Sequence, residues 1–153
     1  MHPAFLPYLA DPETKEPLRL EARRWSGERV VEGTLVSPTA VYPIRAGVPR
    51  FVTGAAGAYA DSFAAQWRRW SRVQFESENR GRPMAGHTRT MWERITGMAG
   101  TLTGSTVGDF GSGSGRFLEI VRAKGGRALG LELSDAADVA AAHFAHDPDV
   151  LVC

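Results

Sequence analysis

Two acidic residues and a cluster of glycines in the last third of the chain have the types and spacing of a nucleotide-cofactor site. Residues 105–115 read Ser-Thr-Val-Gly-Asp-Phe-Gly-Ser-Gly-Ser-Gly, so a short apolar segment leads through Asp109 to three alternating glycines. Glycine lacks a Cβ, which lets the backbone turn sharply and approach a ligand closely. Glu132 closes the next apolar segment and follows Gly111 by 21 positions. A carboxylate at that spacing can accept hydrogen bonds from both hydroxyls of a ribose.

The surrounding pattern predicts the elements that position these residues. From Thr106 onward, apolar runs alternate with helical stretches. Strands are expected over 106–110, 127–133 and 149–153, and helices over 115–124 and 135–145, the second capped by Ser134. This alternation implies a parallel sheet with right-handed crossovers. Ligands of such sheets bind at the carboxyl ends of the strands, where the glycine loop lies.

The glycine spacing discriminates between cofactors. A dinucleotide fingerprint has glycine at relative positions one, three and six. Position six here is Arg116, and the third glycine, Gly115, falls at position five. The carboxylate of Asp109, two residues before Gly111, would repel a pyrophosphate but suits a cationic or amino-bearing ligand. The residues therefore disfavour a dinucleotide; a tight strand–helix turn that holds no ligand is the alternative interpretation.

The segments Val-Gly-Asp-Phe-Gly-Ser-Gly-Ser-Gly and Leu-Gly-Leu-Glu-Leu-Ser resemble the first two cofactor motifs of class I S-adenosylmethionine-dependent methyltransferases. Upstream, Ser-Phe-Ala-Ala-Gln-Trp at 62–67 and Thr-Gly at 96–97 are similar to the lead-in of one bacterial subgroup. Gly-Arg-Phe at 115–117 belongs to the same similarity. The resemblance implies a Rossmann-like α/β fold and S-adenosylmethionine as the cofactor.

The resemblance also implies roles for individual residues. Asp109 would position the methionine end of the cofactor, Glu132 would bind the ribose hydroxyls, and Leu133 would flank the adenine. The loop beneath the cofactor would be formed by Gly111, Ser112, Gly113 and Gly115. No residue of the chain is matched to a catalytic role, and no metal is implied. His143 and His146 are interpreted as a solvated helix end rather than as ligands or bases.

Residues 1–52 predict a small β-rich module. Leu18 and Leu20 alternate with Arg19 as in a half-buried strand. Two further strands are expected over 29–36, broken by Gly33, and over 40–52, with a turn near 46–47. Short strands between proline and glycine turns are typical of such a module.

The same region is similar to the zinc-ribbon-like module that precedes some bacterial methyltransferase domains. The similarity rests on Leu-x-Asp-Pro-x-Thr-x-x-Pro-Leu and on Tyr-Pro-Ile-x-x-Gly-Val-Pro-Arg-Phe. Asp11, Thr14 and Ser37 stand near the places of the paired cysteines of those modules, and the chain's one cysteine is Cys153. The resemblance therefore implies a module without metal; an unrelated β-rich leader is the alternative.

Small residues over 53–60 predict a linker, and the pattern over 61–100 predicts a helical lead-in. One helix is expected to start at Asp61 or Ser62, and a second to be capped by Thr90 with Glu93 and to end at Gly97. A polar loop is expected over 76–87. The first helix would carry four residues on one face, namely Phe63, Trp67, Trp70 and Gln74. Both tryptophans would lie in the core.

The composition of the chain limits the kinds of binding partner that can be expected. The chain has 153 residues, 43% hydrophobic and 23% charged, as in a globular protein. A formal net charge of +1 gives no whole-chain reason to expect nucleic acid or a membrane surface. No run approaches the roughly 18–20 apolar residues of a membrane span, and no signal peptide is recognisable, so a cytoplasmic location is expected.

These observations predict an incomplete Rossmann-like unit, β-α-β-α-β, over 101–153, forming the N-terminal half of a methyltransferase domain in a truncated chain. Its first strand would expose an apolar edge that another chain could cover. One expected function is methyl transfer from S-adenosylmethionine to a small-molecule acceptor. The other is a non-catalytic cofactor-binding remnant that lacks the acceptor site.

Overall fold

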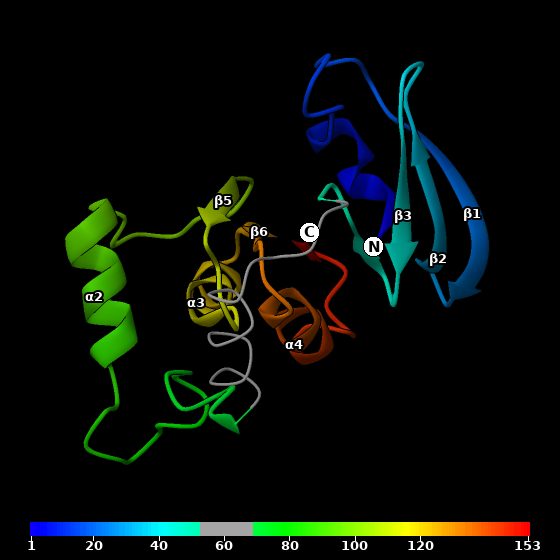
Figure 1. Ribbon diagram of the computed structural model, residues 1–153. Helices are drawn as coiled ribbons and strands as arrows, with labels where there is room; N and C mark the ends of the chain where they lie inside the picture. The colour runs from blue at the N-terminus through cyan, green and yellow to red at the C-terminus, as the bar shows by residue number, and fades with distance from the viewer. Residues whose placement is uncertain (53–68) are drawn as a thin grey trace.

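The computed structural model describes residues 1–52 and 69–153, and the predicted linker and the predicted start of the first helix lie outside these ranges. The N-terminal module is an antiparallel sheet in the order β1-β2-β3-β4 (Figure 1). Its elements are the 3-10 helix η1 (Pro3–Tyr8), β1 (Arg19–Ser26), β2 (Arg29–Val36), β3 (Val41–Arg45) and β4 (Val48–Pro49). The predicted β module is therefore present. The domain limits predicted at residues 52, 60 and 100 stay predictions.

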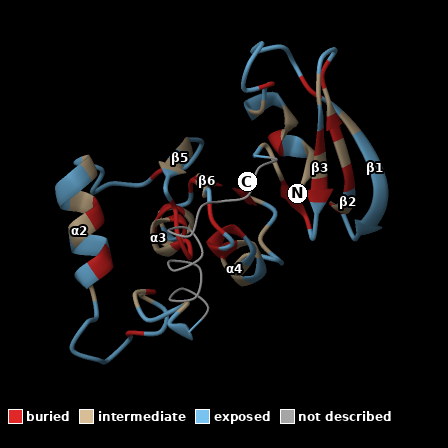
Figure 2. Cartoon of the chain, in the orientation of Figure 1, coloured by how far each residue is buried: buried red, intermediate tan, exposed pale blue. Residues whose placement is uncertain are grey.

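The module buries one side of its sheet. Val30, Leu35 and Ile44 alternate with more exposed neighbours along β2 and β3, while β1 is almost entirely exposed (Figure 2). The expected break at Gly33 is wrong, because β2 continues through this residue, which pairs with Ala22 and Ile44. The backbone of β1 passes close to Gly33, since a Cβ there would lie under 3.0 Å from the Glu21 carbonyl oxygen, and such a close approach is a position for glycine.

Asp11, Thr14 and Ser37, which stand near the places of the cysteines in the similar zinc-ribbon-like modules, meet in the structure. The Asp11 carboxylate accepts hydrogen bonds from the backbone N–H groups of Glu13 (2.9 Å) and Thr14 (3.1 Å) and from the Ser37 hydroxyl (2.5 Å). The residue is 1% exposed. The Ser37 hydroxyl holds the pKa of Asp11 well below its ordinary value, at about 2. One buried carboxylate thus joins the loop before β1 to the loop after β2.

The C-terminal unit alternates strands and helices. It contains β5 (Thr106–Phe110), α3 (Arg116–Ala123), β6 (Arg127–Leu131), α4 (Ala136–His143) and β7 (Val150–Val152). The strands are parallel in the order β5-β6-β7, which confirms the predicted Rossmann-like β-α-β-α-β unit. Strand β5 has the predicted limits, and the other elements are shorter at their ends. The N-cap of α4 is Asp135 and not the predicted Ser134, which precedes the cap, bonds to Glu132 and accepts from the N–H of Ala136 (3.2 Å).

The lead-in differs from its prediction. Residues 70–86 form turns, so the first predicted helix does not continue to Gln74, and Trp70 is 51% exposed rather than in the core. Phe75 is buried there instead. Helix α2 (His87–Thr96) begins before Thr90, which is therefore not its cap, and it ends at Gly97 as predicted. The N–H groups of Gly86 (2.7 Å) and Arg89 (2.9 Å) donate to the Glu76 carboxylate, which satisfies the start of α2.

The two units share their apolar cores. Leu151 of β7 packs with Phe5 and Leu35 of the module, while Val48 of β4 joins the core formed by α3, α4 and the parallel sheet. The module and the end of β7 lie side by side in Figure 1. Among the described residues, no helix combines the length and apolar character needed to cross a membrane.

Candidate cofactor-binding site

A pocket of about 860 Å³ lies at the carboxyl ends of the parallel strands. Gly111, Glu132 and Leu133 line it from the parallel unit, and Pro43, Arg45 and Phe51 line it from the module. This is the edge at which open parallel sheets bind ligands, and the volume lies within the usual range of small-molecule sites. Cys153, which follows β7, also lines the pocket; burial raises the pKa of its thiol to about 12, so the thiol is neutral.

Glu132 connects the glycine loop to the start of α4. One carboxylate oxygen accepts from the N–H of Gly113 (2.8 Å), and the other accepts from the N–H (2.9 Å) and hydroxyl (2.7 Å) of Ser134. Backbone hydrogen bonds fix the path of the glycine loop next to β6, since the N–H groups of Gly111 and Ser112 both donate to the Leu131 carbonyl. An ionised carboxylate has about four acceptor positions, so Glu132 retains capacity for a ligand hydroxyl.

The glycines of the loop have different structural roles. Gly111 has φ of 81°, lines the pocket, and a Cβ built on it would meet no atom within 4 Å. Gly115 has φ of 94°, and its Cβ would lie 2.8 Å from the ring of Phe144. Gly111 therefore leaves the pocket side open to a ligand, whereas Gly115 lets the start of α3 approach α4 closely.

Asp109 stands beside Glu132 on the neighbouring strand. Burial raises the pKa of Asp109 above its ordinary value; the charge of Arg116 opposes this shift, and the negative charge of Glu132 adds a smaller upward contribution. The two carboxylates at the ends of adjacent strands and the guanidinium of Arg116 together carry a net negative charge. A cationic ligand would be attracted here and an anionic pyrophosphate repelled.

The predicted site residues fall into two groups. Gly111, Glu132 and Leu133 line the pocket, and Leu133 is 68% exposed there. The other predicted residues, which lie beside or beneath the pocket without lining it, are Asp109, Ser112, Gly113 and Gly115. The buried hydroxyl of Ser112 has no hydrogen-bond partner among the described residues. The roles assigned to these residues stay predictions.

His143 is not the solvated helix end that the sequence suggested. Its ring packs edge-on against Phe75, with centroids 5.1 Å apart, and its Nδ1 lies 3.2 Å from the Ser114 carbonyl of the glycine loop. Burial lowers the pKa of His143. The position of His143 beside the glycine loop depends on how α4 packs. The sequence carries no local signal for that packing.

Ionisation of Asp109 is expected to cost stability. Because its folded pKa is raised, the folded state binds more protons than the unfolded state between the two pKa values. Protonated Asp109 therefore makes its full contribution to the free energy of unfolding below about pH 3.9, and this contribution is lost as the pH rises through the folded pKa. Asp109→Asn should raise the Tm at pH 7 but not at pH 3.

Differential scanning calorimetry checks this effect, with Asp149→Asn as the control. Asp149 pairs with Arg122 at 3.1 Å, so its replacement should not raise the Tm at pH 7. An unchanged or lower Tm for Asp109→Asn at pH 7 would refute the electrostatic account of the site.

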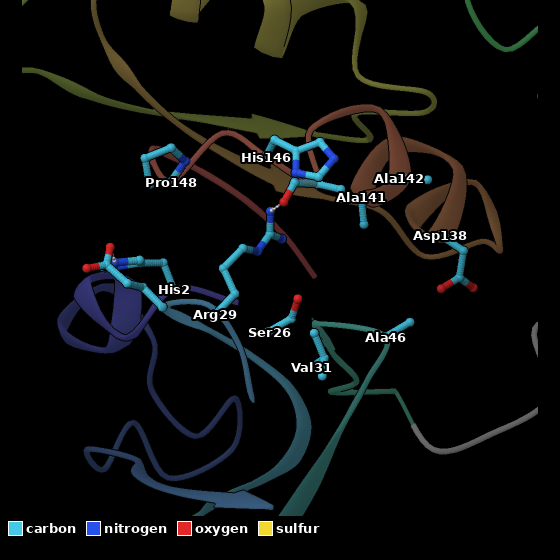
Figure 3. A pocket seen from close by; sticks show the side chains of 12 residues that line it. His2, Ser26, Arg29, Val31, Ala46, Asp138, Ala141, Ala142, His146 and Pro148 are labelled. Atoms are coloured by element: carbon cyan, nitrogen blue, oxygen red, sulfur yellow. Dashed lines mark hydrogen bonds and ion pairs between the residues drawn. The ribbon is translucent and has the colours of Figure 1, made fainter. Parts of the chain in front are cut away.

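A second pocket, of about 500 Å³, separates the module from α4 (Figure 3). Arg29 extends across it from β2 and donates to the carbonyls of Phe144 (2.9 Å) and Ala145 (2.5 Å) at the end of α4. Arg50 forms an ion pair with Asp138 nearby. A cation at the carboxyl end of a helix satisfies free carbonyls and opposes the helix dipole, so these contacts fasten the module to α4.

No protein-family model matches the chain, and neither does any curated protein. A chain from the complex between the Haloferax volcanii Trm112 methyltransferase activator and a proposed methyltransferase is 33% identical over 34% of this chain and 92% of its own, with a TM-score of 0.33. The TehB-like S-adenosylmethionine-dependent methyltransferase of Corynebacterium glutamicum is 24% identical over 64% of this chain and 45% of its own, with a TM-score of 0.38. This chain therefore spans less than half of the TehB-like protein. At these TM-scores neither likeness extends to the overall fold, and function is inferred below from the residues of the site.

Proposed function

We propose that this chain binds S-adenosylmethionine and forms part of an enzyme that transfers its methyl group to a small-molecule acceptor. The observation that carries the proposal is the position of Glu132. Its carboxylate lies at the end of β6, is bonded to the glycine loop, and lines a pocket large enough for a nucleoside. A carboxylate there, with one acceptor position left, fits a hydroxyl of a ribose.

The charges of the site fit the same ligand. S-adenosylmethionine carries a positive sulfonium and a positive ammonium group, and Asp109 lies on the strand next to Glu132 with a raised pKa. Binding of a cation would relieve the repulsion between the two carboxylates. The proposal assigns the methionine end to Asp109 and Gly111, the ribose to Glu132, and the adenine to Leu133.

When bound, S-adenosylmethionine supplies an activated methyl group. The contribution of the chain is to hold the donor in one orientation, since alignment of two reactants can supply a large part of the barrier reduction. Glu132 and the backbone of the glycine loop would hold the ribose and the methionine chain. The neutral thiol of Cys153 takes no acid or base role at neutral pH.

A chain that holds the donor without an acceptor site is the second candidate. Strand β5 forms an edge of the described sheet, with Phe110 at its end 81% exposed. A further chain or segment beside β5 would then contribute the acceptor site. Binding without methyl transfer to any small-molecule pool supports this candidate.

The test of binding is a thermal shift with S-adenosylhomocysteine, the demethylated product. At a ligand concentration 100 times Kd, stability should increase by about 2.7 kcal/mol. NAD at the same concentration should give no shift. A folded protein whose Tm does not respond to S-adenosylhomocysteine would rule out both candidates.

For the N-terminal module we propose that the hydrogen bonds of Asp11 perform the cross-linking that a metal performs in zinc ribbons. Asp11→Ala leaves the N–H groups of Glu13 and Thr14 and the hydroxyl of Ser37 without this acceptor, so the Tm should fall. Its contribution should also decrease as pH falls toward about 2, because the folded pKa is depressed. Glu16→Ala, on an exposed neighbour, is the control. Equal Tm values for the two variants would reject the cross-linking role.

A further inference from the structure

The module contributes directly to the pocket that contains Glu132. Pro43, Arg45 and Phe51 line it together with Leu133. Glu132 and Leu133 belong to the parallel unit, so the pocket exists only where the two units meet. A ligand that fills it must contact both units.

The strand order determines which part of the ligand faces the module. Along β5, β6 and β7, the proposed site places the methionine end at Asp109 on β5 and the ribose at Glu132 after β6. The base, attached to the ribose on the side away from the methionine end, then extends toward β7. Leu151 of β7 packs in the core of the module, and Cys153 lines the pocket beside it. The base therefore points toward the module.

Phe51 is the aromatic residue that the module presents to this pocket. Its ring packs against Tyr42, with centroids 5.0 Å apart and planes tilted by 49°, and Tyr42 is buried. Phe51 also packs against the apolar core of the module. The ring is thus held in place before any ligand arrives, which lowers the entropy cost of binding.

From these contacts we propose that Phe51 packs on the adenine of S-adenosylmethionine, so that the N-terminal module supplies one wall of the nucleoside pocket. Leu133, 68% exposed in the same pocket, supplies the other contact to the base. A flat base with apolar faces suits an aromatic ring and an aliphatic side chain. This inference rests on the proposed function and assigns part of the cofactor site to the module.

The test compares two ligands that differ in the base. S-adenosylhomocysteine carries adenine, and S-ribosylhomocysteine lacks it. Titration calorimetry of the whole chain should show that Phe51→Ala weakens the binding of S-adenosylhomocysteine by about 10- to 100-fold. The affinity for S-ribosylhomocysteine should change by less than about threefold. Phe51→Leu, which keeps an apolar side chain against Tyr42, should lie between wild type and Phe51→Ala.

Phe110→Ala is the matched control, because Phe110 lines the same pocket at the end of β5, away from the base. Phe110→Ala should change the affinity for both ligands by the same factor. Equal losses for both ligands in Phe51→Ala, or no loss, would overturn the inference while leaving the proposed function standing. If Phe51→Ala unfolds, Phe51→Leu provides the same comparison. Failure of the wild-type protein to bind S-adenosylhomocysteine would overturn the proposed function and this inference together.

Discussion

Replacing Glu132 with alanine is expected to weaken the binding of S-adenosylhomocysteine by roughly 10- to 100-fold. Gly113 and Ser134 already occupy three of the roughly four acceptor positions of Glu132, so the proposed contact is one hydrogen bond from a ribose hydroxyl, and a hydrogen bond to a charged group contributes about 1.5–3 kcal/mol. A loss of about 1.5–3 kcal/mol corresponds to roughly 10- to 100-fold in Kd. The variant also removes the acceptor for the N–H of Gly113, which loosens the glycine loop. Calorimetric titration measures the effect.

Glu132→Gln separates the charge from the shape of the side chain. It keeps an oxygen that can accept from Gly113, but its amide NH2 cannot accept from the N–H of Ser134, so the affinity should fall by about 10-fold and the Tm should fall by less than in Glu132→Ala. Glu16→Gln, on an exposed residue of the module, should bind as wild type. If Glu132→Ala retains full affinity, the ribose assignment is wrong.

Replacing Gly115 with alanine is expected to destabilise the fold by about 2–5 kcal/mol. A left-handed backbone costs a non-glycine residue roughly 1–2 kcal/mol, and overpacking costs typically 1–3 kcal/mol. Both apply here, because φ is 94° and the added Cβ would lie 2.8 Å from the Phe144 ring. For a chain of this size the Tm should fall by roughly 5–15 °C. Thermal and urea unfolding measure the loss.

Gly104→Ala isolates the backbone part of this cost. Gly104 has φ of 78°, and its Cβ would meet no atom within 4 Å, so this variant should lose only about 1–2 kcal/mol. Phe144→Leu should restore part of the stability of Gly115→Ala, because it removes the ring edge that the new Cβ meets. Equal losses for the two alanine variants would show that the contact with Phe144 is unimportant.

The parallel unit could be predicted in detail because its signals are local. Apolar runs, glycine turns and helix caps follow one another within a few residues, and β5 has the predicted limits of 106–110. The same holds for β2 and for the turn between β3 and β4 in the module. Asp109, Gly111 and Glu132 could be selected because each lies near the carboxyl end of a predicted strand or directly after it.

Features that depend on distant residues could not be predicted. Helix α2 begins at His87 because Glu76 accepts from Gly86 and Arg89, a contact that overrides the local capping pattern at Thr90. The placement of His143 beside the Ser114 carbonyl depends on tertiary packing in the same way.

The composite pocket could not be predicted either. Its module wall, including Phe51, depends on the packing of Leu151 in the module core and on the bonds from Arg29 to α4. These contacts join residues about a hundred positions apart, and no sequence pattern links them.

The central claim is that the pocket at Glu132 holds S-adenosylmethionine rather than a dinucleotide or no ligand. Titration calorimetry of the folded chain with S-adenosylhomocysteine, followed by the same titration with NAD, tests it most directly. The account predicts one saturable site for S-adenosylhomocysteine and no heat of binding with NAD. Saturable binding of NAD, or no binding of S-adenosylhomocysteine by the folded chain, would contradict it.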